Sequence, residues 1–264
     1  AAAILGMVSP GDEVILFEPY YDSYRAMVTL AGGVCRYMTL KAPSFDIDMG
    51  ALEALISPKT RLLILNTPHN PTGKVFTEAE LLAIGALCRD HGIYILADEV
   101  YEHITFDGCP HVPLATLPGM WDHTLTISST GKTYSMTGWK VGYAIGPAPL
   151  VAAMQAAHQF LTFSTATPLQ HGMVPAFQQG DDFYQGLKAD YQTKRDILVD
   201  GLRAAGLEPI VPQGTYFVLA DIRSVGFEDD RLFARFLTQT IGVACIPTSA
   251  FYTQGVEEGR HLVR

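Results

Sequence analysis

The sequence has no long apolar run and no excess of positive charge. No hydrophobic stretch approaches the roughly 20 residues that a helix needs to cross a bilayer. The formal net charge of the 264 residues is −9, and no cluster of basic residues offsets it. These two absences argue against a membrane or a nucleic acid as the main binding partner.

Cysteines are also few, and their spacing is not that of a disulfide-linked or metal-binding protein. They form no C-x-x-C pair and no metal-ligand pattern. The four are Cys35, Cys88, Cys109 and Cys245. Such cysteines are typical of reduced, buried thiols. We therefore expect a cytoplasmic protein without a metal site.

Both ends of the sequence interrupt a pattern. Residues 1–8 are apolar, but they lack the basic segment and the cleavage site of a signal peptide, and there is no initiator methionine. Residues 261–264 resemble the first half of a strand. We therefore expect this chain to be an internal piece of a longer protein.

Predicted strands and helices alternate over the first part of the chain. Thr77 and Glu80 form a capping-box pattern at the start of one helix, and Asp48 is a plausible N-cap of another. The predicted strands are 13–17, 34–40, 61–66, 93–97 and 123–128, and the predicted helices are 20–31, 48–57 and 77–91. This alternation predicts an α/β fold, with a three-layer α/β/α large domain and a mostly parallel sheet.

The pattern changes in the second part of the chain. A long amphipathic helix is predicted over residues 181–205, and its basic residues, Arg195 among them, are expected to form a solvated face. The other predicted helices are 149–161, 167–178 and 229–240, and the predicted strands are 208–211, 215–221, 243–246 and 261–264. We expect the large domain to comprise residues 1–178, and part of a smaller α+β domain to comprise residues 179–264.

Lys132 is a candidate for cofactor chemistry because of its position. It lies in Ser-Ser-Thr-Gly-Lys-Thr-Tyr, residues 128–134, just after a predicted strand. A lysine there can reach the crevice in which open α/β sheets bind ligands. It could bind phosphate or form a Schiff base with a carbonyl group. A lone lysine of this kind is more often a solvated surface residue.

Two other loops should open at the same edge of the sheet. Asn-Thr-Pro-His-Asn-Pro-Thr-Gly, residues 66–73, predicts a rigid turn that presents the amide of Asn70. Asp98 follows a buried strand, so its carboxylate needs a partner such as a cationic ring nitrogen, an arginine or a helix N-terminus. Tyr101 can reach the same side.

Together these loops carry the groups that pyridoxal phosphate requires. Its aldehyde needs a lysine, and its ring nitrogen needs a carboxylate that keeps it protonated. The ring oxygen needs hydroxyl or amide donors, and the phosphate needs hydroxyls and cations. An aromatic side chain to stack on the ring could come from Glu-Pro-Tyr-Tyr-Asp-Ser-Tyr, residues 18–24.

Three of these segments, in this order, resemble a known family. They are Asn-Thr-Pro-His-Asn-Pro-Thr-Gly (66–73), Ala-Asp-Glu-Val-Tyr (97–101) and Ser-Ser-Thr-Gly-Lys-Thr-Tyr-Ser-Met-Thr-Gly-Trp-Lys-Val-Gly (128–142). Over essentially its whole length the chain resembles the fold-type I, class I/II aminotransferases that depend on pyridoxal phosphate. It is most similar to the methionine and kynurenine (glutamine) aminotransferase group.

The resemblance implies how residues of the large domain would bind the cofactor. Lys132 would hold it as a Schiff base, and Asp98 would pair with the pyridine nitrogen. Asn70 and Tyr101 would bond to the ring oxygen, and Tyr21 would lie on the ring face.

The resemblance also implies which residues would bind anionic groups. Ser129 and Lys140 would bind the cofactor phosphate, although many relatives have arginine where Lys140 stands. Lysine keeps the charge but cannot form two parallel bonds. Arg264, with Asn70, would bind the α-carboxylate of the substrate.

By the same resemblance, the protein would be an enzyme that moves an amino group from an amino acid to a 2-oxo acid, and it would be a homodimer. The donor side chain would be apolar, sulfur-containing or aromatic. Four aromatic residues could favour such side chains, although each fits core packing as well; they are Tyr20, Tyr24, Phe163 and Tyr216. A cysteine-S-conjugate β-lyase and an effector-binding domain of a transcription regulator are the alternatives.

Overall fold

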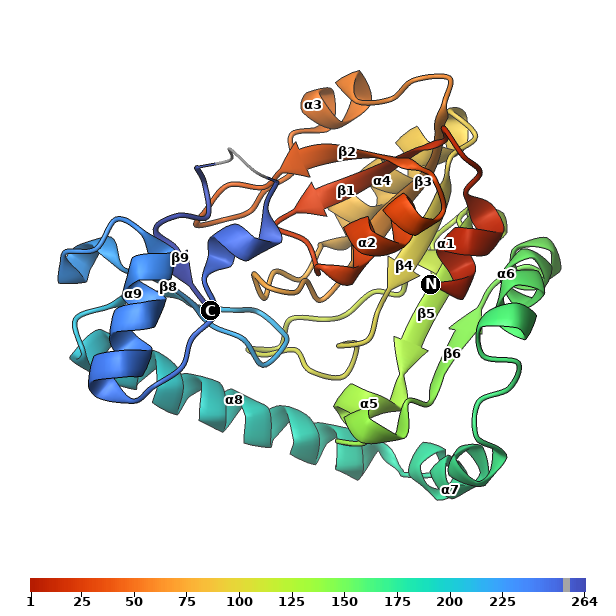
Figure 1. Cartoon of the computed structure of the whole chain (residues 1–264). Helices are drawn as coiled ribbons and strands as arrows, with labels where there is room; N and C mark the ends of the chain where they lie inside the picture. Colours follow the sequence, from red (N-terminus) through yellow and green to blue (C-terminus); the bar gives the residue numbers. More distant parts are fainter. Residues whose placement is uncertain (254–256) are drawn as a thin grey trace.

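The computed structural model describes residues 1–253 and 257–264, and it contains two β-sheets (Figure 1). The larger sheet has the strand order β2-β1-β3-β4-β5-β6. Its neighbouring strands pair in parallel, except that β5 and β6 are antiparallel. The strands are Glu13–Glu18 (β1), Val34–Thr39 (β2), Thr60–Asn66 (β3), Tyr94–Asp98 (β4), Thr124–Ser129 (β5) and Gly142–Ile145 (β6). The predicted mostly parallel sheet is confirmed.

Helices cover both faces of this sheet, and each face has its own apolar core. In β1, Val14 and Leu16 point into one core, whereas Ile15 and Phe17 point into the other. Strands buried on both faces therefore have continuous apolar sequences. The first core includes residues of Ala2–Met7 (α1), Ser23–Leu30 (α2) and Ala148–Leu161 (α6), and the second includes residues of Met49–Ala54 (α3) and Glu78–Asp90 (α4). The three-layer α/β/α architecture is confirmed.

The predicted caps of two helices are present. The side chain of Asp48 accepts a hydrogen bond from Ala51 N at 3.0 Å, at the start of α3. Thr77 and Glu80 form both bonds of a capping box at the start of α4. Helix α1 was not predicted, because six apolar residues show no helical spacing.

The second part of the chain carries a small antiparallel sheet in the order β7-β8-β9. In Figure 1, α8 runs below both sheets and connects α7 to the small sheet. The elements are Thr167–Phe177 (α7), Asp181–Ala204 (α8), Glu208–Ile210 (β7), Leu219–Asp221 (β8), Asp230–Phe236 (α9) with a π-helix at Leu237–Ile241 (η5), and Leu262–Val263 (β9). The predicted boundary between residues 178 and 179 stays a prediction.

Short helices complete the structure, and the described residues contain no helix long and apolar enough to cross a membrane. One of these short helices, Thr130–Thr133 (α5), carries Lys132. The 3-10 turns are Leu114–Thr116 (η1), Trp121–His123 (η2), Thr137–Trp139 (η3), Arg223–Val225 (η4) and Thr248–Phe251 (η6).

Two predicted strands differ from the structure. The strand predicted over residues 215–221 begins only at Leu219, because Thr215 has a left-handed backbone with φ of 67°. Residues 243–246 form no strand. Ile246 instead exchanges two backbone hydrogen bonds with Arg264, of 3.0 and 2.9 Å.

The expected solvated face of α8 is wrong at Arg195. This side chain is only 6% exposed, and its guanidinium donates to both carboxylate oxygens of Asp107, at 2.6 and 2.9 Å. It also lies over the ring of Phe106, 5.0 Å from the ring centre. Arg195 therefore attaches α8 to the loop that follows β4.

Candidate functional site

The loops at the carboxyl ends of β1, β3, β4 and β5 surround a cavity of about 370 Å³. The structure brings seven of the eight predicted site residues into its lining; they are Tyr21, Asn70, Asp98, Tyr101, Ser129, Lys132 and Arg264. Lys140 is exposed and is not part of this lining. It has a left-handed backbone with φ of 57°, and its role at the phosphate stays a prediction.

Lys132 enters the cavity from the short helix α5. Ser129 caps this helix, because its hydroxyl accepts a hydrogen bond from Gly131 N at 3.0 Å. The amine of Lys132 donates to the hydroxyl of Tyr216 at 2.9 Å. It lies 5.7 Å from the ring centre of Tyr101, a distance at which an aromatic face attracts a cation.

Asp98 lies at the end of β4, and its carboxylate has two hydrogen-bond donors. Tyr24 donates to Oδ2 at 2.6 Å, and the backbone N–H of Val100 donates to Oδ1 at 3.2 Å. Burial raises the pKa of Asp98, while these two hydrogen bonds oppose the rise. A cation placed against this carboxylate from the cavity would stabilise its ionised form.

Arg264 and Asn70 are in direct contact. The guanidinium donates to Asn70 Oδ1 at 2.9 Å and lies 4.1 Å from the ring centre of Phe217. Burial lowers the pKa of Arg264, but a guanidinium stays charged at neutral pH. It has five N–H donors, so donors remain that can bind a carboxylate.

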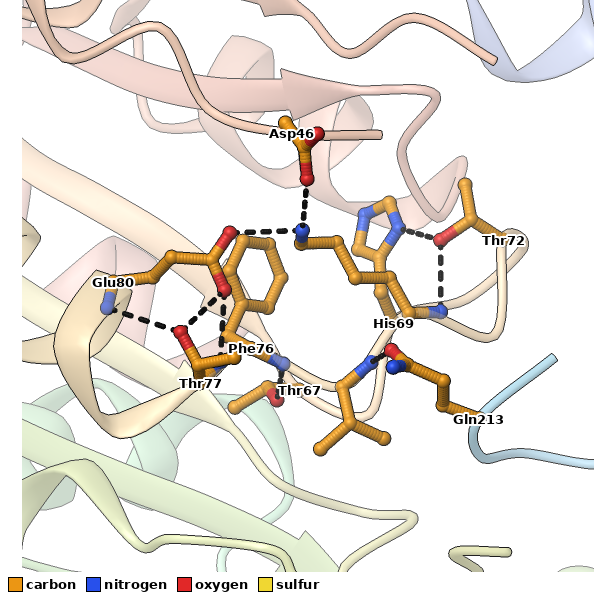
Figure 2. A network of polar contacts seen from close by, with 10 residues as sticks. Asp46, Thr67, His69, Thr72, Phe76, Thr77, Glu80 and Gln213 are labelled. Atoms are coloured by element: carbon orange, nitrogen blue, oxygen red, sulfur yellow. Dashed lines mark hydrogen bonds and ion pairs between the residues drawn. The ribbon is translucent and has the colours of Figure 1, made fainter. Parts of the chain in front are cut away.

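The turn that carries Asn70 is held by a polar network (Figure 2). The amine of Lys74 lies 2.8 Å from Glu80 Oε1 and 3.2 Å from Asp46 Oδ1, and its side chain is only 8% exposed. His69 Nδ1 and Thr72 Oγ1 are 2.7 Å apart. Burial, with the charge of Lys74, lowers the pKa of His69 to about 3, so this imidazole is neutral at physiological pH.

The same turn is joined to the segment that precedes Tyr216. The carbonyl oxygen of Gly73 accepts hydrogen bonds from the backbone N–H groups of Gln213 and Gly214, both at 2.9 Å. The side chain of Gln213 in turn accepts a bond from Val75 N at 3.1 Å. Two loops that are far apart in the sequence are thus fixed to each other beside the cavity.

Three residues of the site were missed or undervalued in the sequence. Tyr24 was considered only for side-chain selectivity, yet it bonds to Asp98, and Asn66 Oδ1 accepts from Asn70 N at 2.7 Å. Tyr216 bonds to Lys132. Of the other aromatic candidates, Tyr20 is buried against Tyr37 and Phe163 is 81% exposed. One indication of their roles was present in the sequence: Tyr24 and Asn66 belong to the segments 18–24 and 66–73, which were already expected to lie at the site.

Known proteins resemble this chain in sequence and in structure. A family model, Aminotransferase class I and II, matches residues 1–261. The chain belongs to this family. It is 44% identical to a methionine aminotransferase of Escherichia coli over 95% of the chain and 65% of the relative, and 43% identical to a kynurenine–oxoglutarate transaminase of Dictyostelium discoideum over 95% and 66%. This aminotransferase-family chain thus spans less than two thirds of the length of these relatives.

Solved structures of aminotransferases superimpose closely on this family member. The N-succinyldiaminopimelate aminotransferase of Mycobacterium tuberculosis matches with a TM-score of 0.96 at 41% identity, over 99% of this chain and 68% of that one. A methionine aminotransferase of Escherichia coli matches with a TM-score of 0.94 at 43% identity, over 99% and 68%.

Class I/II aminotransferases use pyridoxal phosphate, and the side chains of the cavity fit that group. One cavity contains an amine, a half-buried carboxylate whose pKa is raised, and the amide and phenol of Asn70 and Tyr101. An aldehyde, a ring nitrogen that must stay protonated, and a ring oxygen require these partners.

We expect the substitution Glu80→Gln to lower the free energy of unfolding by about 1–2 kcal/mol, because buried Lys74 then keeps only the more exposed Asp46. Glutamine can still form the capping box, so the loss of unfolding free energy reports the Lys74–Glu80 ion pair alone. Urea unfolding measures the change. The matched substitution Glu78→Gln, on the exposed first turn of α4, should cost about 0.3 kcal/mol. Equal losses in the two variants would contradict a stabilising ion pair.

We expect Asp98→Asn to stabilise the cofactor-free protein at neutral pH by about 1 kcal/mol, because it removes a carboxylate that burial destabilises. The pKa of Asp98 is higher in the folded than in the unfolded state. The native state therefore binds the proton more tightly, and the penalty develops as pH rises from about 4 through the raised pKa. Urea unfolding without cofactor, at a series of pH values, measures the gain. A variant that is less stable than wild type at neutral pH would show that the ionised carboxylate is well accommodated.

Proposed function

We propose that this protein is a pyridoxal-phosphate-dependent aminotransferase. It would move an amino group from an apolar, sulfur-containing or aromatic L-amino acid, of the methionine, kynurenine or glutamine type, to a 2-oxo acid. The observation that carries this proposal is the presence of the Lys132 amine, the Asp98 carboxylate and the Arg264 guanidinium in one cavity. The names of the similar methionine and kynurenine transaminases support it.

In this proposal the residues of the cavity divide the work of binding. Bound pyridoxal phosphate would supply an electron sink for the bond broken at the substrate Cα. Asp98 would hold a proton at the ring nitrogen, and Asn70 and Tyr101 would donate to the ring oxygen. Tyr21 would stack on the ring, while Ser129 and Lys140 would bind the phosphate.

Lys132 has two roles in the proposed reaction. Its amine would attach the cofactor through the aldehyde carbon, and the incoming amino acid would release it. The free amine would then take the proton from the substrate Cα as a general base and return it to the cofactor side as a general acid. Lys132 lines the cavity that both molecules would share, and its amine lies beside the rings of Tyr101 and Tyr216.

Arg264 would orient the substrate for this proton transfer. Two parallel hydrogen bonds from a guanidinium to a carboxylate fix both position and direction. Phe217 and Phe251 lie on the guanidinium, at 4.1 and 4.8 Å from its carbon, and limit its movement. Asn70 accepts a hydrogen bond from Arg264, so with its proposed role at the ring oxygen it would join cofactor and substrate binding.

A cytoplasmic homodimer is part of the same proposal. Apolar side chains on α6, α7 and the turn between them are strongly exposed and could be covered by a second copy; they are Phe160, Leu161, Phe163 and Phe177. The exposed fraction of Phe160 is 86%. Large apolar surfaces of this kind are typical of interaction sites.

We expect the protein to absorb visible light after pyridoxal phosphate is added, and Lys132→Ala to abolish this absorption, because alanine has no amine to attach the cofactor. Absorption spectroscopy of both proteins measures the difference. Lys59→Ala serves as the matched control, since Lys59 is exposed in the loop before β3. An unchanged spectrum in Lys132→Ala would refute the proposed function.

We expect methionine, kynurenine or glutamine to bleach this visible band in a single turnover, with a 2-oxo acid as the product, and aspartate to bleach it more slowly. The aromatic and apolar lining of the cavity favours such side chains over a second carboxylate. Stopped-flow absorption with each amino acid measures the preference. Release of pyruvate and ammonia from a cysteine conjugate without bleaching would instead favour the β-lyase alternative.

A further inference from the structure

Tyr216 contacts the amine of Lys132, although the two residues come from different parts of the chain. Lys132 follows β5, whereas Tyr216 lies between β7 and β8. The hydroxyl of Tyr216 accepts a hydrogen bond from Lys132 Nζ at 2.9 Å, and the same nitrogen lies 5.5 Å from the centre of the Tyr216 ring. Among the described residues, the amine therefore has the Tyr216 hydroxyl as its hydrogen-bond partner and the rings of Tyr216 and Tyr101 beside it.

The position of this hydroxyl is set by the backbone and by other rings, not by Lys132. Thr215 has φ of 67°, its N–H donates to Ile104 O at 2.9 Å, and its own hydroxyl accepts from Phe217 N at 3.2 Å. The ring of Tyr216 packs edge-on against Tyr101, with centres 5.4 Å apart. Because the turn and the ring are held by these contacts, the Tyr216 hydroxyl is a fixed hydrogen-bond acceptor that can position the amine of the flexible Lys132 side chain.

The next residue contacts the other cationic group of the cavity. Phe217 lies under the guanidinium of Arg264, 4.1 Å from its carbon atom. Two consecutive side chains, Tyr216 and Phe217, thus touch the proposed base and the proposed carboxylate-binding group.

We propose that Tyr216 is a positioning residue for proton transfer at the substrate Cα. Its hydroxyl accepts an N–H of Lys132 whenever that amine is not bonded to the cofactor, and it holds the nitrogen toward the substrate. The proton that leaves Cα goes to Lys132 Nζ and returns from it, so Tyr216 keeps its own proton throughout. This inference rests on the proposed function, and it adds a residue that the sequence motifs do not contain.

The test uses Tyr216→Phe, which keeps the ring and removes only the hydroxyl. In single turnovers with methionine, the rate constant for bleaching should fall by about 5- to 10-fold, the effect of one lost hydrogen bond. The dissociation constant for methionine should stay within about twofold, because the hydroxyl does not contact Arg264. Tyr94→Phe is the matched control, since Tyr94 lies at the opposite end of β4 from Asp98.

A second measurement does not require the cofactor. The rate of trinitrobenzenesulfonate labelling at Lys132 at a fixed pH, followed by peptide mass spectrometry, reports how freely its amine reacts. The hydrogen bond to the Tyr216 hydroxyl restrains this nitrogen, so Tyr216→Phe should raise the labelling rate by about 3- to 10-fold, the effect of one lost hydrogen bond. Tyr94→Phe should leave it unchanged.

The two measurements separate the possible failures. Identical labelling rates of wild type and Tyr216→Phe would overturn the inference, whatever the cofactor does. Faster labelling of Tyr216→Phe, in a protein that never gains visible absorption with pyridoxal phosphate, would refute the proposed function while supporting the hydrogen bond. A weaker affinity for methionine with an unchanged bleaching rate would assign Tyr216 to substrate binding and overturn its positioning role.

Discussion

The half-buried carboxylate of Asp98, which faces the cavity, is the constraint on which the rest of the site depends. A carboxylate at the end of a buried strand is costly unless donors and a cation surround it. The protein supplies the donors from two other places, Tyr24 of α2 and the backbone of Val100. Asn66 fixes the end of the same strand, because its amide donates to the Asp98 carbonyl at 2.8 Å. The proposed cofactor would add a cationic ring nitrogen against this carboxylate, so that cofactor binding and folding stability would be coupled through one side chain.

Around this carboxylate the chain assembles groups that are far apart in sequence. The parallel sheet places the ends of β3, β4 and β5 next to one another, and this brings Asn70, Asp98 and Lys132 to one edge. The remaining partners come from the second part of the chain. They are held there by backbone bonds, because Arg264 is paired with Ile246 and the segment before Tyr216 is bonded to Gly73. The large sheet therefore positions the residues that would bind the proposed cofactor. The second part of the chain positions the residues that would bind the substrate.

Much of the fold and of the site could be predicted from the sequence, because both depend on local patterns. Apolar strands, the capping box of Thr77 and the polar residues after each strand are local signals, and they predicted that the loops carrying Asn70, Asp98 and Lys132 would meet at one edge of the sheet. The places of Tyr21 and Arg264 in the site were predicted only from the family resemblance. Contacts across the chain could not be predicted in this way. Nothing local distinguishes Arg195, which pairs with Asp107, from the solvated cations of α8. Likewise, the extended pattern of residues 215–221 conceals the left-handed Thr215 that turns Tyr216 toward Lys132.

The glycine that ends the Asn-Pro-Thr-Gly turn has a use beyond its backbone conformation. Its φ is 72°, but a β-carbon at Gly73 would also lie 2.2 Å from Cβ of Pro212 and 3.0 Å from the carbonyl oxygen of Gly214. A side chain at this position would push the turn that carries Asn70 away from the segment that leads to Tyr216. The Asn-Pro-Thr-Gly turn is therefore also a packing surface for residues 212–214 of the second part of the chain. The absence of a side chain at Gly73 allows the two segments to lie this close together.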